Sequence, residues 1–291
     1  MKKLLTILAT FYTLDPRWLY LAAVIALVLP MVLAFPLPKG IPTRGTIGLY
    51  DMAASCPSNK VILIDSSWDQ YSKPETASQL SCFVEDLCHR KVRFVVISTT
   101  SPYAPDFAMD IIEPIAKEAG AVYGEDWVHL GFIGIVQTAD SMGGVGAVVI
   151  DSFCRDVHKA RPVDIHGTPV SEIPVMQDVK KAEDFHFVFA INYCPDLAWI
   201  SFGKEQHGLP VAFGCAAMMS PYYYLYVDSG QMGGLMTGNR GAYEYESMTG
   251  IHGKGFALMR SFAFGHCFII IAAILGNIGY WSALRLRRMD A

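Results

Sequence analysis

Hydrophobic residues are concentrated near the two ends of the chain, on either side of a long polar region. Trp18 to Leu37 contains 20 residues without Asp, Glu, Lys or Arg, and Ser261 to Leu284 contains 24. A helix rises about 1.5 Å per residue, so each run is long enough to cross a hydrocarbon core of roughly 30 Å. The pattern therefore predicts transmembrane helices over residues 18–38 and 261–284, with one soluble domain between them.

A short segment, residues 1–17, precedes the first run and combines Lys2 and Lys3 with Leu, Ile, Phe and Tyr. It is compatible with a short helix on the membrane surface or with a disordered tail. A cleaved signal peptide is disfavoured, because Pro36-Leu-Pro38 follows the run and offers no small-x-small cleavage site. We therefore expect a two-span protein of the bacterial inner membrane, with a basic tail over residues 285–291.

Charges beside the two runs predict the orientation in the membrane. Lysine and arginine accumulate on the cytoplasmic side of membrane helices. Six of them flank the outer ends of the runs and four flank the ends next to the domain, so we expect cytoplasmic termini and an extracytoplasmic domain. The outer six are Lys2, Lys3, Arg17, Arg285, Arg287 and Arg288, and the inner four are Lys39, Arg44, Lys254 and Arg260.

Between the two runs, residues 39–220 alternate between short apolar runs and helical patterns. Apolar runs of this kind are typical of strands buried on both faces. Strands that alternate with helices predict crossover connections, and therefore an α/β domain with a Rossmann-like, mostly parallel sheet. The expected strands are 61–65, 93–98, a segment within 128–136, 185–191 and 211–214, and the expected helices are 72–89, 105–119, 145–159, 174–183 and 195–206.

Small residues recur every four positions in the segment 221–260, at Gly230, Gly234, Gly238 and Ala242. Glycine costs about 1 kcal/mol inside a helix, so a helix with this spacing needs a close packing contact in return. The segment is interpreted as a long glycine-rich helix packed on the membrane helices or on a neighbouring subunit, or else as a glycine-rich loop. Ala272, Gly276 and Asn277 repeat this small and polar pattern inside the second apolar run, where they predict helix–helix packing.

Net charge and motifs exclude several functions. A formal charge of −4 offers no basic field for nucleic acid. The sequence contains no phosphate-binding loop, complete dinucleotide fingerprint, nucleophile elbow or zinc-protease motif, so no cofactor and no metal are predicted. Cys154 and His158, with His166 nearby, form a possible thiolate or metal cluster, for which ordinary packing is the favoured interpretation.

Asp65, Ser66 and Ser67 follow the first predicted strand, and Ser98 ends the second. The carboxyl ends of parallel strands are the usual ligand-binding edge of an open α/β sheet. These four residues are therefore candidate ligand contacts. The alternative is that they cap the following helices, which is the commonest role of Asp and Ser at such positions.

Three charged residues and two tyrosines are further candidates for contacts. Glu244 and Glu246 near Arg240 suggest an acid/base pair or an anion clamp, but residues two apart on a helix do not share a face. We therefore favour a subunit-to-subunit salt bridge or a solvated polar face. Tyr222 and Tyr223 belong to an aromatic run of the kind enriched at protein interfaces.

Several segments give the chain a resemblance that covers nearly its whole length. They are Asp15-Pro-Arg-Trp18, Tyr123-Gly-Glu-Asp-Trp-Val-His-Leu-Gly131, Tyr223 through Ser229-Gly-Gln231, Gly238-Asn-Arg-Gly-Ala-Tyr-Glu-Tyr-Glu246 and Leu275-Gly-Asn-Ile278. In these segments the chain resembles a group of uncharacterised prokaryotic two-span membrane proteins. The resemblance implies the architecture described above and no reaction.

These observations predict a structural or scaffolding subunit of a multi-subunit membrane complex. Its expected partners are the lipid bilayer and further copies of the chain or other membrane-protein subunits. The first alternative is a membrane-anchored sensor that binds a small ligand at the Asp65 and Ser98 edge. The second is an enzyme at the membrane surface that uses Cys154 or Glu244.

Overall fold

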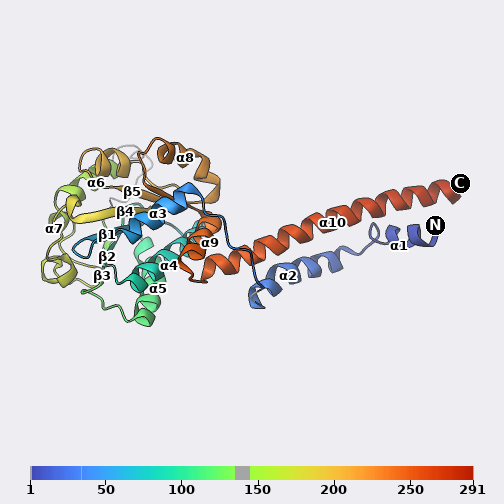
Figure 1. Cartoon of the computed structure of the whole chain (residues 1–291), viewed down its shortest axis with the longest axis horizontal. Coiled ribbons are helices and arrows are strands. Elements are labelled where there is room, and N and C mark those ends of the chain that lie inside the picture. Colours follow the sequence, from blue (N-terminus) through green and yellow to red (C-terminus); the bar gives the residue numbers. More distant parts are fainter. Residues whose placement is uncertain (1, 34, 135–144, 291) are drawn as a thin grey trace. The chain divides into compact units, whose positions relative to one another are not determined.

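The computed structural model describes residues 2–33, 35–134 and 145–290, which form two separate units. One unit is the domain Lys39–Gly255, and the other combines the two terminal segments, up to Pro38 and from Phe256 onward. Figure 1 shows the domain as a sheet covered by helices and the terminal segments as helices. Each unit is described by itself below.

The domain contains a six-stranded sheet in which every neighbouring pair of strands is parallel. The strand order is β3-β2-β1-β4-β5-β6, so the order reverses between β1 and β4. This finding confirms the α/β prediction and the Rossmann-like sheet. The strands are β1 (Val61–Ser66), β2 (Phe94–Ser98), β3 (Trp127–Phe132), β4 (Phe185–Ile191), β5 (Val211–Cys215) and β6 (Gly234–Thr237).

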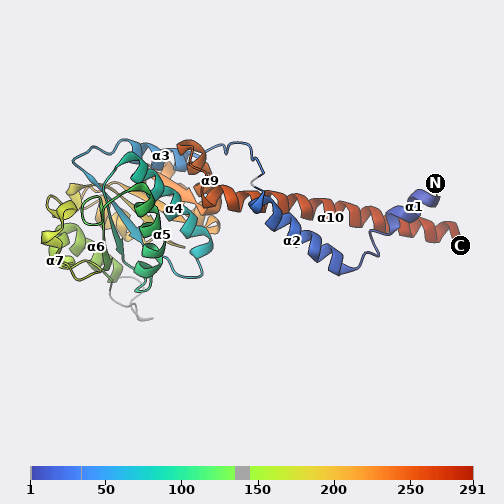
Figure 2. The same cartoon turned by 90° about the horizontal axis from the view of Figure 1, so that it is seen from below.

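Helices cover both faces of the sheet, as Figure 2 shows from below. Successive residues of a strand point to opposite faces, so Leu63 belongs to one hydrophobic cluster and Ile64 to the other. The helices on the Ile64 face are α3 (Arg44–Ala54), α4 (Lys73–Arg90), α5 (Ala104–Ala119) and α9 (Gly238–Thr249). The Leu63 face packs against α6 (Val145–Arg155), α7 (Val157–Ala160) and α8 (Ser220–Asp228).

Two of the expected helices have other forms. In place of the helix expected over 174–183, the structure has a 3₁₀ turn at Pro174–Met176 and another at Ala182–Asp184. A third 3₁₀ turn, Val170–Glu172, precedes the segment. The segment 195–206 contains one π-helical stretch, Trp199–Lys204. The expected regular α-helices over these two segments are therefore wrong in detail.

The predicted long helix over 221–247 is wrong. Helix α8 ends at Asp228, and Gly230 turns the chain with a positive φ of 74°. The chain then adds β6 to the sheet, with Gly234 paired to Ala212 of β5. A Cβ at Gly234 would lie 2.6 Å from the Leu49 backbone, so this glycine permits α3 to approach the sheet rather than one helix to approach another. The sheet domain therefore extends beyond residue 220, to Gly255.

Helix α3 was not predicted, because the prolines and glycines around it are typical of a linker. Thr43 caps it by accepting a hydrogen bond from the Thr46 N–H. Gly48 lies so close to the Gly233 carbonyl oxygen that a side chain would collide with it. The glycines of this segment therefore serve close packing on β6.

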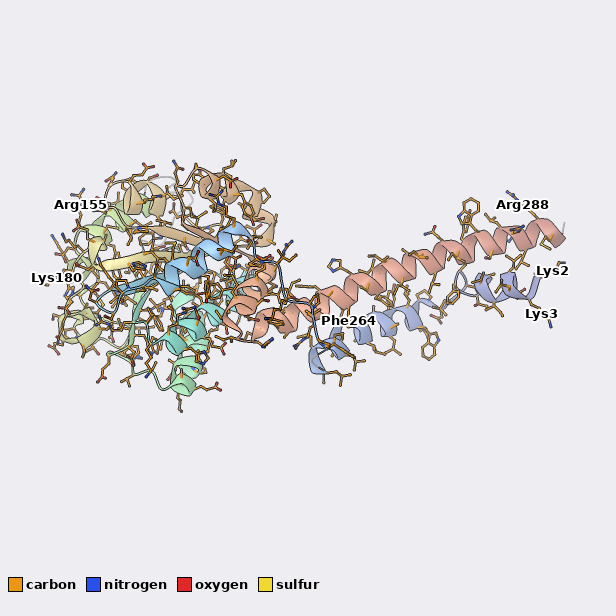
Figure 3. The ribbon with its side chains drawn as sticks, in the orientation of Figure 1. Lys2, Lys3, Arg155, Lys180, Phe264 and Arg288 are labelled. Atoms are coloured by element: carbon orange, nitrogen blue, oxygen red, sulfur yellow. The ribbon has the colours of Figure 1, made fainter. Side chains whose placement is uncertain are left out.

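The terminal unit contains α1 (Lys2–Ala9), α2 (Pro16–Val32) and most of α10 (Lys254–Asp290). In the part of the chain that the structure describes, one helix, α10, is long and apolar enough to cross a membrane. Figure 3 labels Phe264 and Arg288 along it. Helix α2 has only 17 residues, includes Pro30 and ends six residues before Pro38, so it is shorter than the span predicted for 18–38.

The small residues of α10 make a different contact from the one expected. Nothing lies within 4 Å of the position of a Cβ at Gly276, and the Asn277 side chain donates to the Ala273 carbonyl of its own helix at 2.8 Å. A Cβ at Gly279 would instead lie 3.0 Å from the Leu8 carbonyl oxygen. Among the described glycines of α10, Gly279 and Gly265 are thus positions of close approach, since a Cβ at Gly265 would lie 2.6 Å from the Leu27 side chain, whereas Gly276 is not.

Candidate functional site

The Asp65 carboxylate lies in a closed polar network at the carboxyl end of β1. Ser67 donates its hydroxyl to Oδ1, and Thr99 donates its hydroxyl to Oδ2 at 2.7 Å. The Trp199 indole N–H also donates to Oδ2, at 2.7 Å. The Thr99 backbone N–H donates to Oδ1 at 3.2 Å. Asp65 thus joins the ends of β1 and β2 to the turn that follows β4.

Burial is the main influence on the pKa of Asp65, because only 3% of this residue is exposed. Loss of hydration raises the pKa of this carboxyl from 3.8 to about 6, although the donors from Ser67, Thr99 and Trp199 act in the opposite direction. The Ser67 and Thr99 hydroxyls can rotate to accept a hydrogen bond from the O–H of a neutral carboxyl. The network can therefore hold Asp65 in either protonation state.

The four predicted edge residues do lie together, but none of them is accessible to a ligand. Ser98 donates its hydroxyl to the Ser66 carbonyl at 2.6 Å, and both residues are fully buried. Ser67 is 4% exposed. The side chains of Asp65, Ser67 and Ser98 connect strand ends, whereas the buried Ser66 hydroxyl has no hydrogen-bond partner among the described residues. Thr99 and Trp199 complete the network and were missed, because Trp199 is 134 positions from Asp65 in the sequence.

Two further hydrogen bonds lead from this network to the surface. Thr100 donates its hydroxyl to the Ser67 carbonyl at 2.8 Å, and the Asn192 amide donates to the Thr100 hydroxyl at 3.1 Å. Asn192 follows β4, on the other side of the point where the strand order reverses. The accessible part of the edge is therefore formed by Thr100 and Asn192, one layer outside the predicted residues.

Glu244, on α9, is a buried carboxylate that holds the start of α3. Its Oε2 accepts hydrogen bonds from the Thr43 N–H at 2.9 Å and from the Thr46 hydroxyl at 3.0 Å. Its Oε1 accepts from Arg240, one turn earlier, at 2.8 Å. A carboxylate at a helix N-terminus also interacts favourably with the helix dipole. The solvated polar face expected for this residue is therefore wrong, since only 1% of Glu244 is exposed.

Glu246 makes the corresponding contact with the start of α10. It is fully buried, and its Oε1 accepts the Gly255 N–H at 2.8 Å. Ser247 follows Glu246 on α9, and its hydroxyl accepts a hydrogen bond from the Gly40 N–H at 3.4 Å. One face of α9 thus binds the segment that enters the domain and another binds the segment that leaves it. We call Glu244, Glu246 and Ser247 the α9 clamp.

A buried row of polar contacts fixes α9 to α4. The Tyr245 hydroxyl donates to Asp86 at 2.7 Å, and the other Asp86 oxygen accepts from Arg90 at 2.8 Å. The Ser78 hydroxyl donates to the Asn239 side chain at 2.7 Å. The α9 clamp is therefore supported by a helix of the sheet domain rather than by a loop.

The remaining interface candidates separate into buried and exposed residues. Gly234, Gly238 and Ala242 are buried inside the domain, and so is Tyr223, which is fully enclosed. Tyr222, Gly230 and Arg240 are exposed. Only the second group is available to a neighbouring subunit without rearrangement of the domain.

The cysteine–histidine pair has the geometry of ordinary packing. Burial raises the pKa of the Cys154 thiol to about 12, which disfavours a thiolate. The His158 Nε2 atom lies 2.8 Å from the Val179 carbonyl oxygen and 3.2 Å from that of Met176. Among the described residues, no group of three or more His, Cys, Asp and Glu is placed to hold a metal ion.

Large exposed apolar side chains gather in the segments that follow the strands. Tyr71 lies between β1 and α4 and is 94% exposed, and Tyr103 lies between β2 and α5. Segments that follow parallel strands lie at the carboxyl edge of the sheet. We call this surface the carboxyl-edge face; it consists of Tyr71, Tyr103, Tyr193, Met218, Tyr222 and Leu225.

The parallel sheet and helix α10 define the class of the protein as a Rossmann-like α/β domain attached to a candidate membrane helix. Comparisons with family models, with curated proteins and with solved structures find no match for the chain.

Proposed function

We propose that the chain is a structural subunit of a multi-subunit bacterial membrane complex, with the carboxyl-edge face as its contact surface. The observation that carries this proposal is the gathering of exposed tyrosine, methionine and leucine side chains on that face. Tyrosine and methionine are enriched at protein interfaces, and contiguous exposed apolar surface often marks a docking site. The partners are further copies of the chain or other membrane-protein subunits.

The α9 clamp supports an anchoring role. A domain that is anchored in a membrane complex needs well-ordered junctions at the points where the chain enters and leaves it. Glu244 and Glu246 provide buried hydrogen bonds at both junctions. Buried hydrogen bonds to a charged group contribute about 1.5–3 kcal/mol each, which opposes fraying of the junctions.

Native mass tests the proposal. The detergent-solubilised complex should be much heavier than one 32.1 kDa chain. Replacing Tyr103 and Leu225 by Ser should reduce the mass to that of a single chain, because both side chains are about 70% exposed and belong to the contact surface. Val122→Ser is the matched control, since Val122 is 48% exposed and lies before β3, away from the carboxyl edge. A wild-type protein that remains a single chain at high concentration would contradict the proposal.

The membrane arrangement is a second part of the proposal. The apolar run through Leu37 would form a second span beside α10, with both termini in the cytoplasm and the domain outside. The flanking lysines and arginines favour this orientation. An impermeant maleimide should then label Cys56, which is half-buried, when it is added to the outside of intact cells or to spheroplasts. Labelling only after lysis would reverse the orientation.

A further inference from the structure

A hollow of about 590 Å³ opens at the point where the strand order reverses. Residues after β2, β4 and β5 line it, so side chains distant in the sequence converge there. The crevice outside the carboxyl ends of strands at such a reversal is the common ligand site of open α/β sheets. The polar lining residues are Thr100, Asn192, Cys194, Asp196, Tyr222 and Tyr223.

Hydrogen bonds fix the floor of the hollow before any ligand binds. The Asn192 amide is held by the Thr100 hydroxyl at 3.1 Å, and Thr100 is held in turn by the Ser67 carbonyl. Tyr223 is fully buried and donates its hydroxyl to the Pro195 carbonyl at 2.7 Å. A preorganised site loses little conformational entropy on binding, which favours affinity.

The charge of the lining selects the class of ligand. Among the described lining residues, Asp196 is the one that carries a charge, and Lys, Arg and His are absent. Asp196 Oδ1 accepts the Ala198 N–H at 2.9 Å, which leaves further lone pairs of the carboxylate for a ligand. A phosphate or carboxylate ligand would meet this negative charge without a cation to balance it, whereas an ammonium group would be attracted.

Aromatic rings at the same hollow favour the same class. The Tyr222 and Tyr223 rings lie 5.2 Å apart between centroids and are nearly perpendicular, at 81°. Tyr222 is 46% exposed, so its ring is accessible to a ligand. Tyrosine rings attract cations with about 0.5–2 kcal/mol, more so when the cation is desolvated.

We propose that this hollow binds a small organic cation, with its ammonium group between the Asp196 carboxylate and the Tyr222 ring. The hydroxyl of Thr100 and the amide of Asn192 would accept the polar remainder of the ligand. The hollow shares Tyr222 with the carboxyl-edge face, so the ligand and a docked subunit would meet at this residue, but ligand binding is a different property of the domain from the proposed subunit contacts.

Choline and its uncharged isostere 3,3-dimethylbutan-1-ol are suitable probes, because a neutral carbon in the isostere replaces the positively charged nitrogen of choline and the shape is kept. Cys194 is exposed in the hollow and reports occupancy through its rate of alkylation, while Cys56 serves as an internal control outside it. In the full-length protein in detergent, saturating choline should slow alkylation of Cys194 by at least about threefold and leave Cys56 unchanged. The isostere should have no such effect, because the attraction is electrostatic.

Two variants locate the site, and a third controls for surface changes. Asp196→Asn and Tyr222→Leu should each weaken choline protection about tenfold, whereas Tyr71→Leu, at a tyrosine outside the hollow, should retain it. Saturation-transfer NMR of the choline methyl protons gives a second readout that does not depend on cysteine reactivity. The proposal is overturned if choline gives neither protection nor saturation transfer, if the isostere protects equally, or if Asp196→Asn binds choline as the wild type does.

Discussion

Two buried carboxylates of this domain, Asp65 and Glu244, have hydrogen-bond environments of different kinds. Asp65 accepts mainly from side chains, two hydroxyls and an indole, and its hydroxyl partners can reverse their role. Glu244 accepts from the Thr43 N–H and the Thr46 hydroxyl at the start of α3 and from the Arg240 guanidinium, so one of its partners is a cation. Asp65 therefore tolerates a proton, whereas Glu244 holds the start of a helix beside a cation. Two carboxyls that are buried to a similar extent can therefore have different roles, one joining strand ends and the other holding the start of a helix.

Removing Glu244 should give the largest change. Glu244→Ala leaves the Thr43 N–H and the Thr46 hydroxyl without their acceptor and removes a favourable charge from the α3 N-terminus. We expect the free energy of unfolding of the domain to fall by about 3–4 kcal/mol. Urea unfolding followed by tryptophan fluorescence measures the loss, and hydrogen exchange should accelerate at residues 43–47. Glu113→Ala, at an exposed position of α5, should change stability little; equal losses would refute the distinction.

Protonation of Asp65 should give the next largest change. Its pKa is raised by folding, so the native state binds the proton more tightly than the unfolded state does. The contribution of Asp65 to the free energy of unfolding is therefore largest below about pH 4. It falls as the pH rises to about 6 and does not change further above that. The full change is at most about 3 kcal/mol, at about 1.4 kcal/mol per pH unit.

Asp65→Asn isolates that contribution, because the amide keeps the shape of the neutral acid. The difference in unfolding free energy between wild type and variant should change across pH 4–6 in favour of the variant at the upper end. Measuring the difference cancels the titration of other groups. A difference that is flat with pH would mean that Asp65 titrates alike in both states.

Removing Arg240 should give the smallest change. Its pair with Glu244 spans one turn of α9, and the arginine side chain is 67% exposed. Glu244 is buried but keeps its Thr43 and Thr46 donors when Arg240 is removed, so Arg240→Ala should cost about 1 kcal/mol, less than Glu244→Ala. Urea unfolding of both variants under one condition makes the test. A comparable loss for the two would show that the ion pair, and not the α3 contact, is the main role of Glu244.

The sequence was informative where burial alone decides structure. Strand Phe185–Ile191 is apolar at every position except His186, as expected of a strand buried on both faces, so its position was predicted well. The glycines from 230 to 238 were misread, because a four-residue spacing arises by chance across a turn, a strand and a helix start. A glycine in a sequence predicts that another part of the chain packs closely against its backbone, but it does not predict which element that is.

The candidate sites were harder to predict than the fold. Asp65, Ser66, Ser67 and Ser98 were grouped correctly through the rule for strand ends, but the hydrogen bond from the distant Trp199 to Asp65 was not predicted. Glu244 and Glu246 were singled out, yet their partners at Thr43 and Gly255 come from segments without a distinctive pattern. Long-range hydrogen bonds of this kind leave no periodic signal in a sequence.

The close spacing of the two junctions at Tyr243 has a consequence for how the domain can be moved between proteins. A Cβ at Gly40 would lie 2.7 Å from the Tyr243 ring, and one at Gly255 would lie 2.7 Å from the Tyr243 nitrogen. Domains with neighbouring termini tolerate insertion into other chains. Because residues 39–255 enter and leave beside the same residue, we expect this segment to suit insertion into a loop of another protein, with short spacers at either end.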